Sequence, residues 1–449
     1  MKQPLTSVEL GFSALLALAW SSSGQATDAF DAGSPWLFGD LGGSRQQLAA
    51  EGLDVGLYYL SEFANNAHGG HDNRNETVSS DQTALIINYN MTPTLGIEGD
   101  WSLAITNRNN HQLLNNTRLN DPRGPQTNLS QEVWGSGSFT RITHLTFHRD
   151  YLDGAIGIRV GRMSPTEEFF PDPHGCDFQA LQNCGTVPGN SNIWYGWPVA
   201  TWGLSTTWHL APHVYVKAGV YQQNPDDLKK SRAWSFSFKG GKGEIYPVLL
   251  GWQPQWGAKR YAGNYFIGAF YSNVDSSDVY EGASGGAQAL TPSAGFKQRT
   301  DRKSAWVYAS QQLTGPGGSS AQGLQVFANA EVNDPRTSVI HYVYGAGLYY
   351  TGPLANRSRD VIGFATTMTH INDRWARNRS LNNVMQGYDS DDPLYSPAVS
   401  QELNSELYYR WQATGSVYLQ PGVQYYRHPG AVDSVPDAVV LALRMGVSF

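Results

Sequence analysis

An alternation of large and small side chains over the last twelve residues, 438–449, gives the clearest structural signal in the chain. One set of positions is apolar and mostly large: Val439, Leu441, Leu443, Met445, Val447 and Phe449. The positions between them are smaller or polar: Ala438, Val440, Ala442, Arg444, Gly446 and Ser448. A period of two predicts a β-strand. An edge strand of a soluble sheet would avoid an unbroken apolar face. In a transmembrane β-barrel that face meets lipid and the other face meets the lumen.

Similar strand-like patterns recur from Leu53 onward. Within 402–411, one face carries leucine and aromatic residues and the other carries Glu402, Glu406, Tyr408 and Arg410. The predicted strands are 54–64, 83–91, 97–107, 139–149, 154–162, 199–210, 213–222, 243–252, 263–273, 304–313, 323–331, 340–351, 359–369, 402–411, 415–425 and 438–449. These sixteen segments predict an all-β fold, a 16-stranded antiparallel transmembrane β-barrel.

The connections between these segments mostly alternate between short and long. The short ones include 91–94, 150–153 and 211–212, whereas the long ones are polar and rich in Asn, Asp, Gly and Pro: 108–138, 163–198, 274–303 and 370–401. A compact soluble domain rarely carries several structureless loops of this length. Bacterial outer-membrane barrels have short periplasmic turns and long outer loops. Sixteen strands also leave room for an aqueous channel.

The N-terminal residues predict export and a short helix. Lys2, an apolar run from Gly11 to Trp20 and the small residues before Ala26 resemble a signal peptide cleaved after Ala26. We therefore divide the chain into a signal peptide (1–26), an N-terminal segment with a short helix (27–53) and the barrel (54–449). Ser44 is the expected helix cap and Gly52 the expected stop, and the helix should pack on or inside the barrel rim.

Composition narrows the class of protein. Mean hydropathy is −0.40, and no apolar stretch of about 18 residues follows the N-terminus, which excludes a helical membrane protein. Aromatic residues make up 12% of the chain and 48 residues are glycine. Aromatic girdles and small lumen-facing residues would use that composition, although a secreted lectin or glycosidase would use it too. A net charge of −7 argues against a nucleic-acid partner.

The long loop after the fifth predicted strand contains both cysteines of the chain, Cys176 and Cys184. In an exported protein this spacing predicts a disulfide, which would stiffen a loop in or over the pore. The alternative is a reduced metal-binding pair, but no His or Cys cluster completes a zinc site. We therefore predict neither a metal nor a cofactor.

Charged residues beside this loop are candidates for the pore constriction. We predict that Arg162 and one of Glu167 and Glu168 face each other there, with the Phe169 ring beside them. Charged groups bond hydroxyls, and a ring packs on the apolar face of a pyranose, so this set would suit a sugar. The alternative is a solvated loop base. Further pore-lining candidates are Glu402, Glu406, Tyr408 and Arg410, whose alternative role is a structural ladder of lumen charges.

Several segments, taken in order, resemble the carbohydrate-selective porins of the OprB type. The resemblance begins with Leu37-Phe-Gly-Asp-Leu-Gly-Gly43 and Arg45, where Leu41 replaces the usual Trp. It continues through Gly161-Arg162 to Glu168-Phe169, Cys176-Asp-Phe-Gln179 to Cys184-Gly185, Gly219 to Gln222 with Asn224-Pro225, Gly323 to Asn329 with Asp334-Pro-Arg336, Arg359-Asp360 with Gly363, Glu406 to Arg410, Leu419-Gln-Pro421 and His428-Pro-Gly430. The resemblance covers some 400 residues. It departs at Pro247-Val248-Leu249, where such chains often show Pro-x-Glu.

The resemblance implies an outer-membrane channel for passive diffusion of sugars such as glucose, with no catalysis. The alternatives are a general, unselective porin of the same fold, a barrel enzyme and a soluble polysaccharide-binding protein. No activated nucleophile supports the enzyme. The expected partners are small sugars, outer-membrane lipid and the barrel-assembly machinery, which would read the terminal Phe449. We expect no nucleic-acid partner, and we favour a monomer over a trimer.

Overall fold

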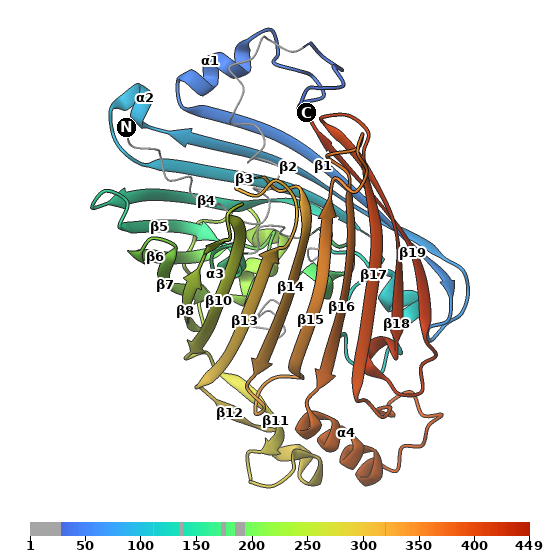
Figure 1. Ribbon diagram of the computed structural model, residues 1–449. Coiled ribbons are helices and arrows are strands. Elements are labelled where there is room, and N and C mark those ends of the chain that lie inside the picture. The colour runs from blue at the N-terminus through green and yellow to red at the C-terminus, as the bar shows by residue number, and fades with distance from the viewer. Residues whose placement is uncertain (1–27, 111, 134–137, 172–176, 185–193, 319) are drawn as a thin grey trace.

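The structure, a computed structural model, describes residues 28–110, 112–133, 138–171, 177–184, 194–318 and 320–449. One antiparallel sheet closes into a barrel because β1 (Leu53–His68) pairs with both β2 (Thr77–Asn90) and the last strand, β19 (Ala438–Ser448) (Figure 1). The other long strands are β3 (Asp100–Asn110), β4 (Phe139–Tyr151), β5 (Ile156–Met163), β6 (Thr201–Ala211), β7 (Val214–Gln223), β8 (Gly243–Trp252), β10 (Tyr261–Ser272), β13 (Arg302–Gln312), β14 (Gly323–Asn333), β15 (Ile340–Thr351), β16 (Val361–Ile371), β17 (Gln401–Gln412) and β18 (Val417–Arg427). A two-residue strand, β9 (Gln255–Trp256), extends the pairing of β10. The predicted 16-stranded antiparallel barrel is confirmed.

The two faces of the strands have the predicted character. In β19, Leu441 and Leu443 are exposed on the outside, whereas Ala442 and Arg444 are buried on the inside. In β17, Leu407 and Trp411 are exposed outside while Glu402 and Glu406 are buried inside. Because side chains alternate along a strand, the apolar outer face and the polar inner face arise together. Among the described residues, no helix is long and apolar enough to cross a membrane.

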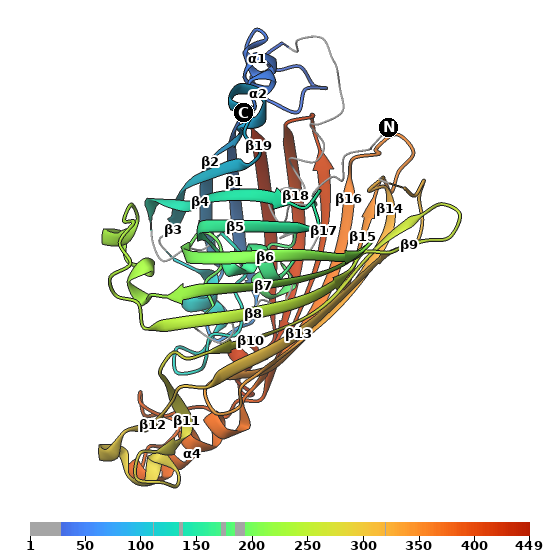
Figure 2. The same cartoon turned by 90° about the vertical axis from the view of Figure 1, so that its left-hand side faces the viewer.

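The N-terminal segment and the C-terminus meet at one end of the barrel (Figure 2). The Leu37 amide donates to the Ser448 carbonyl over 2.8 Å, and the Phe38 and Phe449 ring centroids lie 5.5 Å apart. Helix α1 (Ser44–Ala50) lies at this rim beside β1, where the Arg45 guanidinium donates to the Phe449 carbonyl. The N-terminal segment thus covers the end of the last strand.

The ends of α1 differ in part from the prediction. Gly43, with φ of 91°, occupies the N-cap position, and no side chain caps the helix, so the predicted Ser44 cap is wrong. A left-handed backbone there favours glycine over a side-chain-bearing cap. Gly52 follows the helix with φ of 86°, as expected for a stop. The short helix α2 (Thr92–Leu95) lies in the first short turn at the same end.

The long loops gather at the opposite end, and two of them are not structureless as predicted (Figure 1). The loop before β13 contains the hairpin β11 (Ser276–Gly282) and β12 (Phe296–Arg299). The loop before β17 contains α4 (Asp373–Gln386), capped by the Asn372 side chain. Arg374 of α4 pairs with Asp278 of β11 over 3.0 Å, so these two loops form one outer platform. The sequence did not predict these elements because a helix or hairpin that is polar on all sides has no hydrophobic periodicity.

Aromatic rings on the inner face pair across strands with glycine. Six such register pairs are Gly203–Tyr221, Gly251–Tyr215, Gly268–Trp306, Gly347–Phe327, Gly363–Tyr408 and Gly446–Tyr418. A Cβ atom added to any of these glycines would meet the partner ring at 2.1–2.6 Å. Each ring therefore lies against the sheet in space that only glycine leaves, an arrangement that offsets the weakness of glycine in a strand.

We predict that Gly363→Ala destabilises the barrel. The new methyl group would lie 2.3 Å from carbons of the fully buried Tyr408 ring, which packs edge-on against Phe178 and has no space to turn. Overpacking of this kind costs about 1–3 kcal/mol. The measurement is the temperature to which the sample must be heated before electrophoresis for the band of the folded barrel to disappear. Gly196→Ala is the matched control, since its nearest atom would be Thr166 Oγ1 at 3.6 Å, and an equal loss in both variants would contradict the prediction.

Candidate solute channel and its constriction

Two outer loops turn back into the barrel and narrow its lumen. The second loop connects β3 to β4 and is described at 112–133, and the third loop connects β5 to β6 and is described at 164–171, 177–184 and 194–200. The second loop contains the π-helical turn η1 (Asn115–Leu119), and the third loop contains α3 (Pro165–Phe169) and the 3₁₀ turn η2 (Leu181–Cys184). Buried contacts to the inner face of the wall fix both loops.

Carboxylates of β17 hold the two inner loops in place. Glu406 accepts the Gln179 and Ala180 amides of the third loop over 2.9 and 2.7 Å. Glu402 accepts the Thr127 hydroxyl of the second loop over 2.6 Å, and it also accepts the Gly430 amide over 2.7 Å. Both carboxylates are 1% exposed. Hydrogen bonds to charged acceptors are roughly twice as strong as neutral ones, so these residues position the loops.

Helix α3 is fixed by a third buried carboxylate, that of Glu168. The Glu168 carboxylate lies 3.0 Å from Lys217 Nζ and 3.2 Å from Arg159 Nε, and it accepts a hydrogen bond from the Ser205 hydroxyl over 3.0 Å. Burial acts to raise the pKa of Glu168, but the two cations and these hydrogen bonds outweigh it and hold the pKa well below its usual range. Its neighbour Glu167 is less covered, with its carboxylate 3.7 Å from His144 Nδ1.

The aromatic residues of the third loop form a core inside the barrel. Phe169 is fully buried and meets the rings of Tyr221 and Trp194 edge-on. Phe178 is also fully buried, with the Tyr408 ring centroid at 5.2 Å. Phe169 and Tyr408 were predicted to line the pore, but both rings are covered on all sides. Their burial fixes the loop against the wall through apolar contact.

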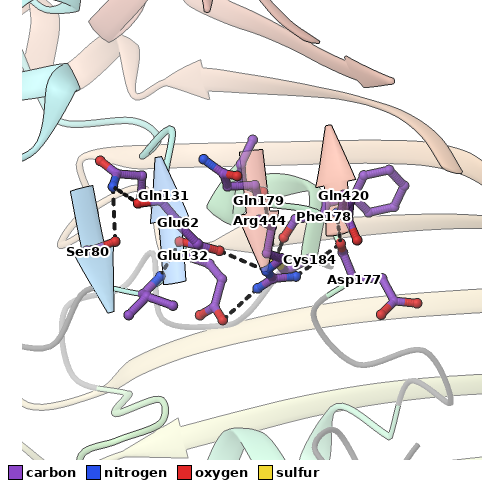
Figure 3. A network of polar contacts seen from close by, with 12 residues as sticks. Glu62, Ser80, Gln131, Glu132, Asp177, Phe178, Gln179, Cys184, Gln420 and Arg444 are labelled. Atoms are coloured by element: carbon purple, nitrogen blue, oxygen red, sulfur yellow. Dashed lines mark hydrogen bonds and ion pairs between the residues drawn. The ribbon is translucent and has the colours of Figure 1, made fainter. Parts of the chain in front are cut away.

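A cluster of charged side chains lies where the inner loops meet β1, β3, β17 and β19. Figure 3 shows its members Glu62, Glu132, Asp177 and Arg444. We call it the lumen charge cluster, and its members are Glu62, Arg108, Glu132, Asp177, Arg410 and Arg444. Arg444 is at its centre, with Nε 3.0 Å from Glu62 and Nη2 2.9 Å from Glu132, and Nη1 donates to the Asp177 carbonyl over 3.1 Å. Arg108 lies 3.5 Å from the other oxygen of Glu132.

Within this cluster, Arg410 and Asp177 retain the most exposure. Their side chains are 15% and 17% exposed and pair over 2.8 Å. Arg410 Nε also donates to Gln420 Oε1 over 2.8 Å, and the guanidinium lies 4.7 Å from the Tyr418 ring centroid. Of the four β17 residues predicted to line the pore, Arg410 is therefore the one whose charged group stays accessible.

Sequence reasoning missed Trp197 and Trp36 as candidate pore-lining rings. Both are partly buried and pack against the inner cluster that contains Tyr58. Gln82 Oε1 accepts both the Trp197 indole N–H at 2.8 Å and Arg108 Nε at 2.7 Å, which joins this ring to the lumen charge cluster. Trp197 is remote in sequence from Gln82, so only its position in a Trp- and Tyr-rich stretch could have drawn attention to it.

Two positions singled out from the sequence lie away from the constriction. Arg162 shares a face of β5 with the exposed Val160, and it bonds to the Ala200 and Ser235 carbonyls and to Asp227. The prediction that Arg162 faces the glutamates fails because strand alternation turns it away from Arg159, which does contact Glu168. Leu249, at the departure from the family pattern, points inward but is 1% exposed within the aromatic core.

The cysteine and metal predictions are tested only in part. Cys184 lies buried in η2, but Cys176 falls outside the described residues, so their disulfide stays a prediction. In the part of the chain that the structure describes, no group of three His, Cys, Asp or Glu side chains is placed to hold a metal ion.

We predict that Glu406→Ala loosens the third loop. The change leaves two buried amides, of Gln179 and Ala180, without their acceptor, and each unpaired donor costs about 1–3 kcal/mol. Single-channel recordings should show a larger and noisier current. Glu406→Gln keeps one acceptor oxygen and should have a smaller effect. Ser405→Ala, on the opposite face of the strand, is the control, and a quiet, wild-type current from Glu406→Ala would contradict this role.

Comparison with known proteins agrees with this architecture. Residues 74–449 match the family model of the carbohydrate-selective porin, OprB family. The chain is 38% identical to Porin B of Pseudomonas aeruginosa over 440 residues, which is 97% of this chain and 96% of that protein. It is 31% identical to the putative porin QuiX of Acinetobacter baylyi over 433 residues, covering 94% and 95% of the two chains.

A solved structure shows the same fold. The high-pH structure of Pseudomonas putida OprB superposes with a TM-score of 0.90 at 37% identity, over 94% of this chain and 100% of that one. A closed barrel with inner loops and this degree of similarity describes a channel of the bacterial outer membrane and not an enzyme. The chain therefore belongs to the OprB family of carbohydrate-selective porins, and it is an outer-membrane porin for sugars.

Proposed function

We propose that this porin selects small neutral sugars, glucose among them, at the lumen charge cluster, with Arg410, Asp177 and the Trp197 ring as contact groups. The single observation that carries the proposal is the direct pairing of the charges. Three guanidinium groups, of Arg108, Arg410 and Arg444, meet three carboxylates, of Glu62, Glu132 and Asp177. The charges cancel within the cluster.

A cluster without net charge favours an uncharged solute. It offers charge-assisted donors and acceptors to hydroxyl groups, because Arg supplies only donors and an ionised carboxylate only acceptors. An anion or a cation gains little, since each charge it approaches already has an opposite partner at 2.8–3.5 Å. A sugar can exchange hydroxyl hydrogen bonds with the Arg410–Asp177 pair while a ring face covers its apolar side.

The proposed mechanism is diffusion through weak binding sites. Conduction requires binding that is favourable enough for entry and weak enough for release. The buried members of the cluster, which are 0–8% exposed, hold Arg410 and Asp177 in position, so the solute meets groups that are already oriented. Glu168, Phe169, Glu402, Glu406 and Tyr408 support the site as positioning residues. Glu167, at 23% side-chain exposure, is a further contact group in this proposal.

Conductance in a planar bilayer tests sugar selectivity. Titration with glucose should reduce the current stepwise, whereas an amino acid of similar size should leave it unchanged. An unselective porin of the same fold, the main rival, would show neither effect. Absence of glucose block from a folded barrel would rule out a binding site in the lumen.

Two charge-changing variants test the role of the cluster. Asp177→Asn leaves three guanidiniums against two carboxylates and should shift the reversal potential in a salt gradient toward anions. Arg410→Gln should shift it toward cations. Each variant should weaken glucose block about tenfold, because a charge-assisted hydrogen bond is lost. Glu98→Gln, in a periplasmic turn, is the control. Shifts of the same sign in both variants, or none, would contradict the charge-balance argument.

The remaining expectations about the chain are proposals as well. We propose that residues 1–26 are a signal peptide, 27–53 an N-terminal segment with a short helix and 54–449 the barrel; the N-terminal sequence of the mature protein would check the cleavage site. We also propose that outer-membrane lipid surrounds the exposed apolar face, that the assembly machinery reads Phe449, and that the barrel acts as a monomer. Light scattering of the solubilised protein would check the monomer.

A further inference from the structure

The fourth outer loop, residues 224–242 between β7 and β8, combines cations with exposed aromatic rings. It carries five cationic residues against Asp226 and Asp227: Lys229, Lys230, Arg232, Lys239 and Lys242. Trp234, Phe236 and Phe238 are 54%, 46% and 62% exposed. Exposed rings together with cations are typical of residues at a lipid–water boundary. The transport function of the barrel gives this loop no role.

The loop lies against the lipid-facing side of the wall. The Phe238 ring stacks on Trp202 of β6, with centroids 4.6 Å apart, and Phe236 meets the same indole at 6.5 Å. Trp202 shares its face with Leu204, which is exposed on the outside of the barrel. Loop 224–242 connects strands at the end of the barrel opposite the N-terminal segment and the C-terminus (Figure 2). Its rings therefore belong to the outer-leaflet end of the wall.

Buried polar contacts hold the loop in one conformation. Arg162 Nη2 lies 3.3 Å from Asp227, and the Arg162 guanidinium also donates to the Ser235 carbonyl. The Ile142 amide of β4 donates to the Ala233 carbonyl over 3.0 Å. Arg162 and Asp227 are 4% and 7% exposed. This ordered surface loses less conformational entropy on binding than a mobile loop would.

A cavity of about 320 Å³ lies between this loop and the outer ends of β3 and β4. Its lining residues are Asn107, Phe139, Thr140, Lys230, Ala233 and Trp234. Asn107 points outward, since its neighbour Arg108 points into the lumen charge cluster. The cavity therefore belongs to the outer flank of the barrel and not to the sugar path. An ammonium group suits a phosphate, and rings beside an amide and a hydroxyl suit a sugar.

We propose that loop 224–242 and this cavity bind the phosphorylated sugar headgroup of an outer-leaflet glycolipid. Lys230 pairs with the phosphate, the Trp234 ring covers the sugar, and Phe236 and Phe238 lie among the first carbons of the acyl chains. The neighbouring cations add attraction to the anionic surface. Arg162, which the sequence placed in the pore, acts as a positioning residue for this lipid site.

Titration of the detergent-solubilised full chain with diphosphorylated lipid A tests the proposal. Lys230→Gln should weaken binding about fivefold, as expected for one cation at an anionic lipid surface. The double variant Lys230→Gln with Trp234→Ala should weaken lipid binding further. The wild-type protein should prefer diphosphorylated lipid A over the same lipid with its phosphates removed, and raised NaCl should reduce the preference.

The double variant Trp256→Ala with Lys259→Gln is the matched control. These residues also form an exposed aromatic and basic pair, but in the turn between β8 and β10 at the opposite rim. Equal losses in the two double variants would overturn the site, as would equal affinity for the two lipids or unchanged affinity after Lys230→Gln. Heat-dependent gel migration and single-channel conductance should stay at wild-type values in every variant, since neither pair lies in the lumen.

Discussion

The backbone of a membrane-spanning sheet must satisfy every amide and carbonyl without help from water. This constraint leaves closure as the solution, because an open sheet edge in hydrocarbon costs several kcal/mol for each unpaired group. Here closure depends on β1 and β19, the strands nearest the two ends of the chain, which pair from Tyr58 with Ser448 to His68 with Val439. The N-terminal segment then covers the end of β19 through the Leu37 and Arg45 contacts.

Closure also creates an interior space that the protein must fill. Sixteen strands enclose more space than wall side chains fill, and two outer loops enter that space. Their attachment has two components. Aromatic rings of the third loop pack on rings of the wall, which lie flat because cross-strand glycines make room for them. Buried carboxylates, of Glu402, Glu406 and Glu168, bind the loops by charge-assisted hydrogen bonds. The aromatic contacts supply apolar burial, and the carboxylates fix the position of each loop relative to the wall.

The charges that remain define what the lumen can recognise. Buried ion pairs are costly to desolvate, and their use here is better explained by orientation than by stability. The Arg444 guanidinium connects β19 to a carboxylate of β1 and a carboxylate of the second loop. Glu132 also lies near Arg108 of β3. The cluster can form only when the barrel is closed and both loops are in place, so the proposed selectivity depends on the complete fold.

The sequence by itself determined the barrel, because the period of two along each strand is a local pattern. The neighbours of a single residue such as Arg444 are enough to assign it to the inner face of the wall. It also placed Glu402, Glu406, Tyr408 and Arg410 on the inner face, and it located the strands to within a few residues at most ends. It did not determine which inward groups reach water. Glu406 and Arg410 are equivalent in pattern, but a loop more than 200 residues away covers one and leaves the other accessible. Arg162 points outward with Val160 by the alternation of β5, so here the local pattern already held the answer. Trp197, by contrast, joined the lumen through Gln82 because long loops fold by contacts between distant residues, and no local periodicity records those contacts.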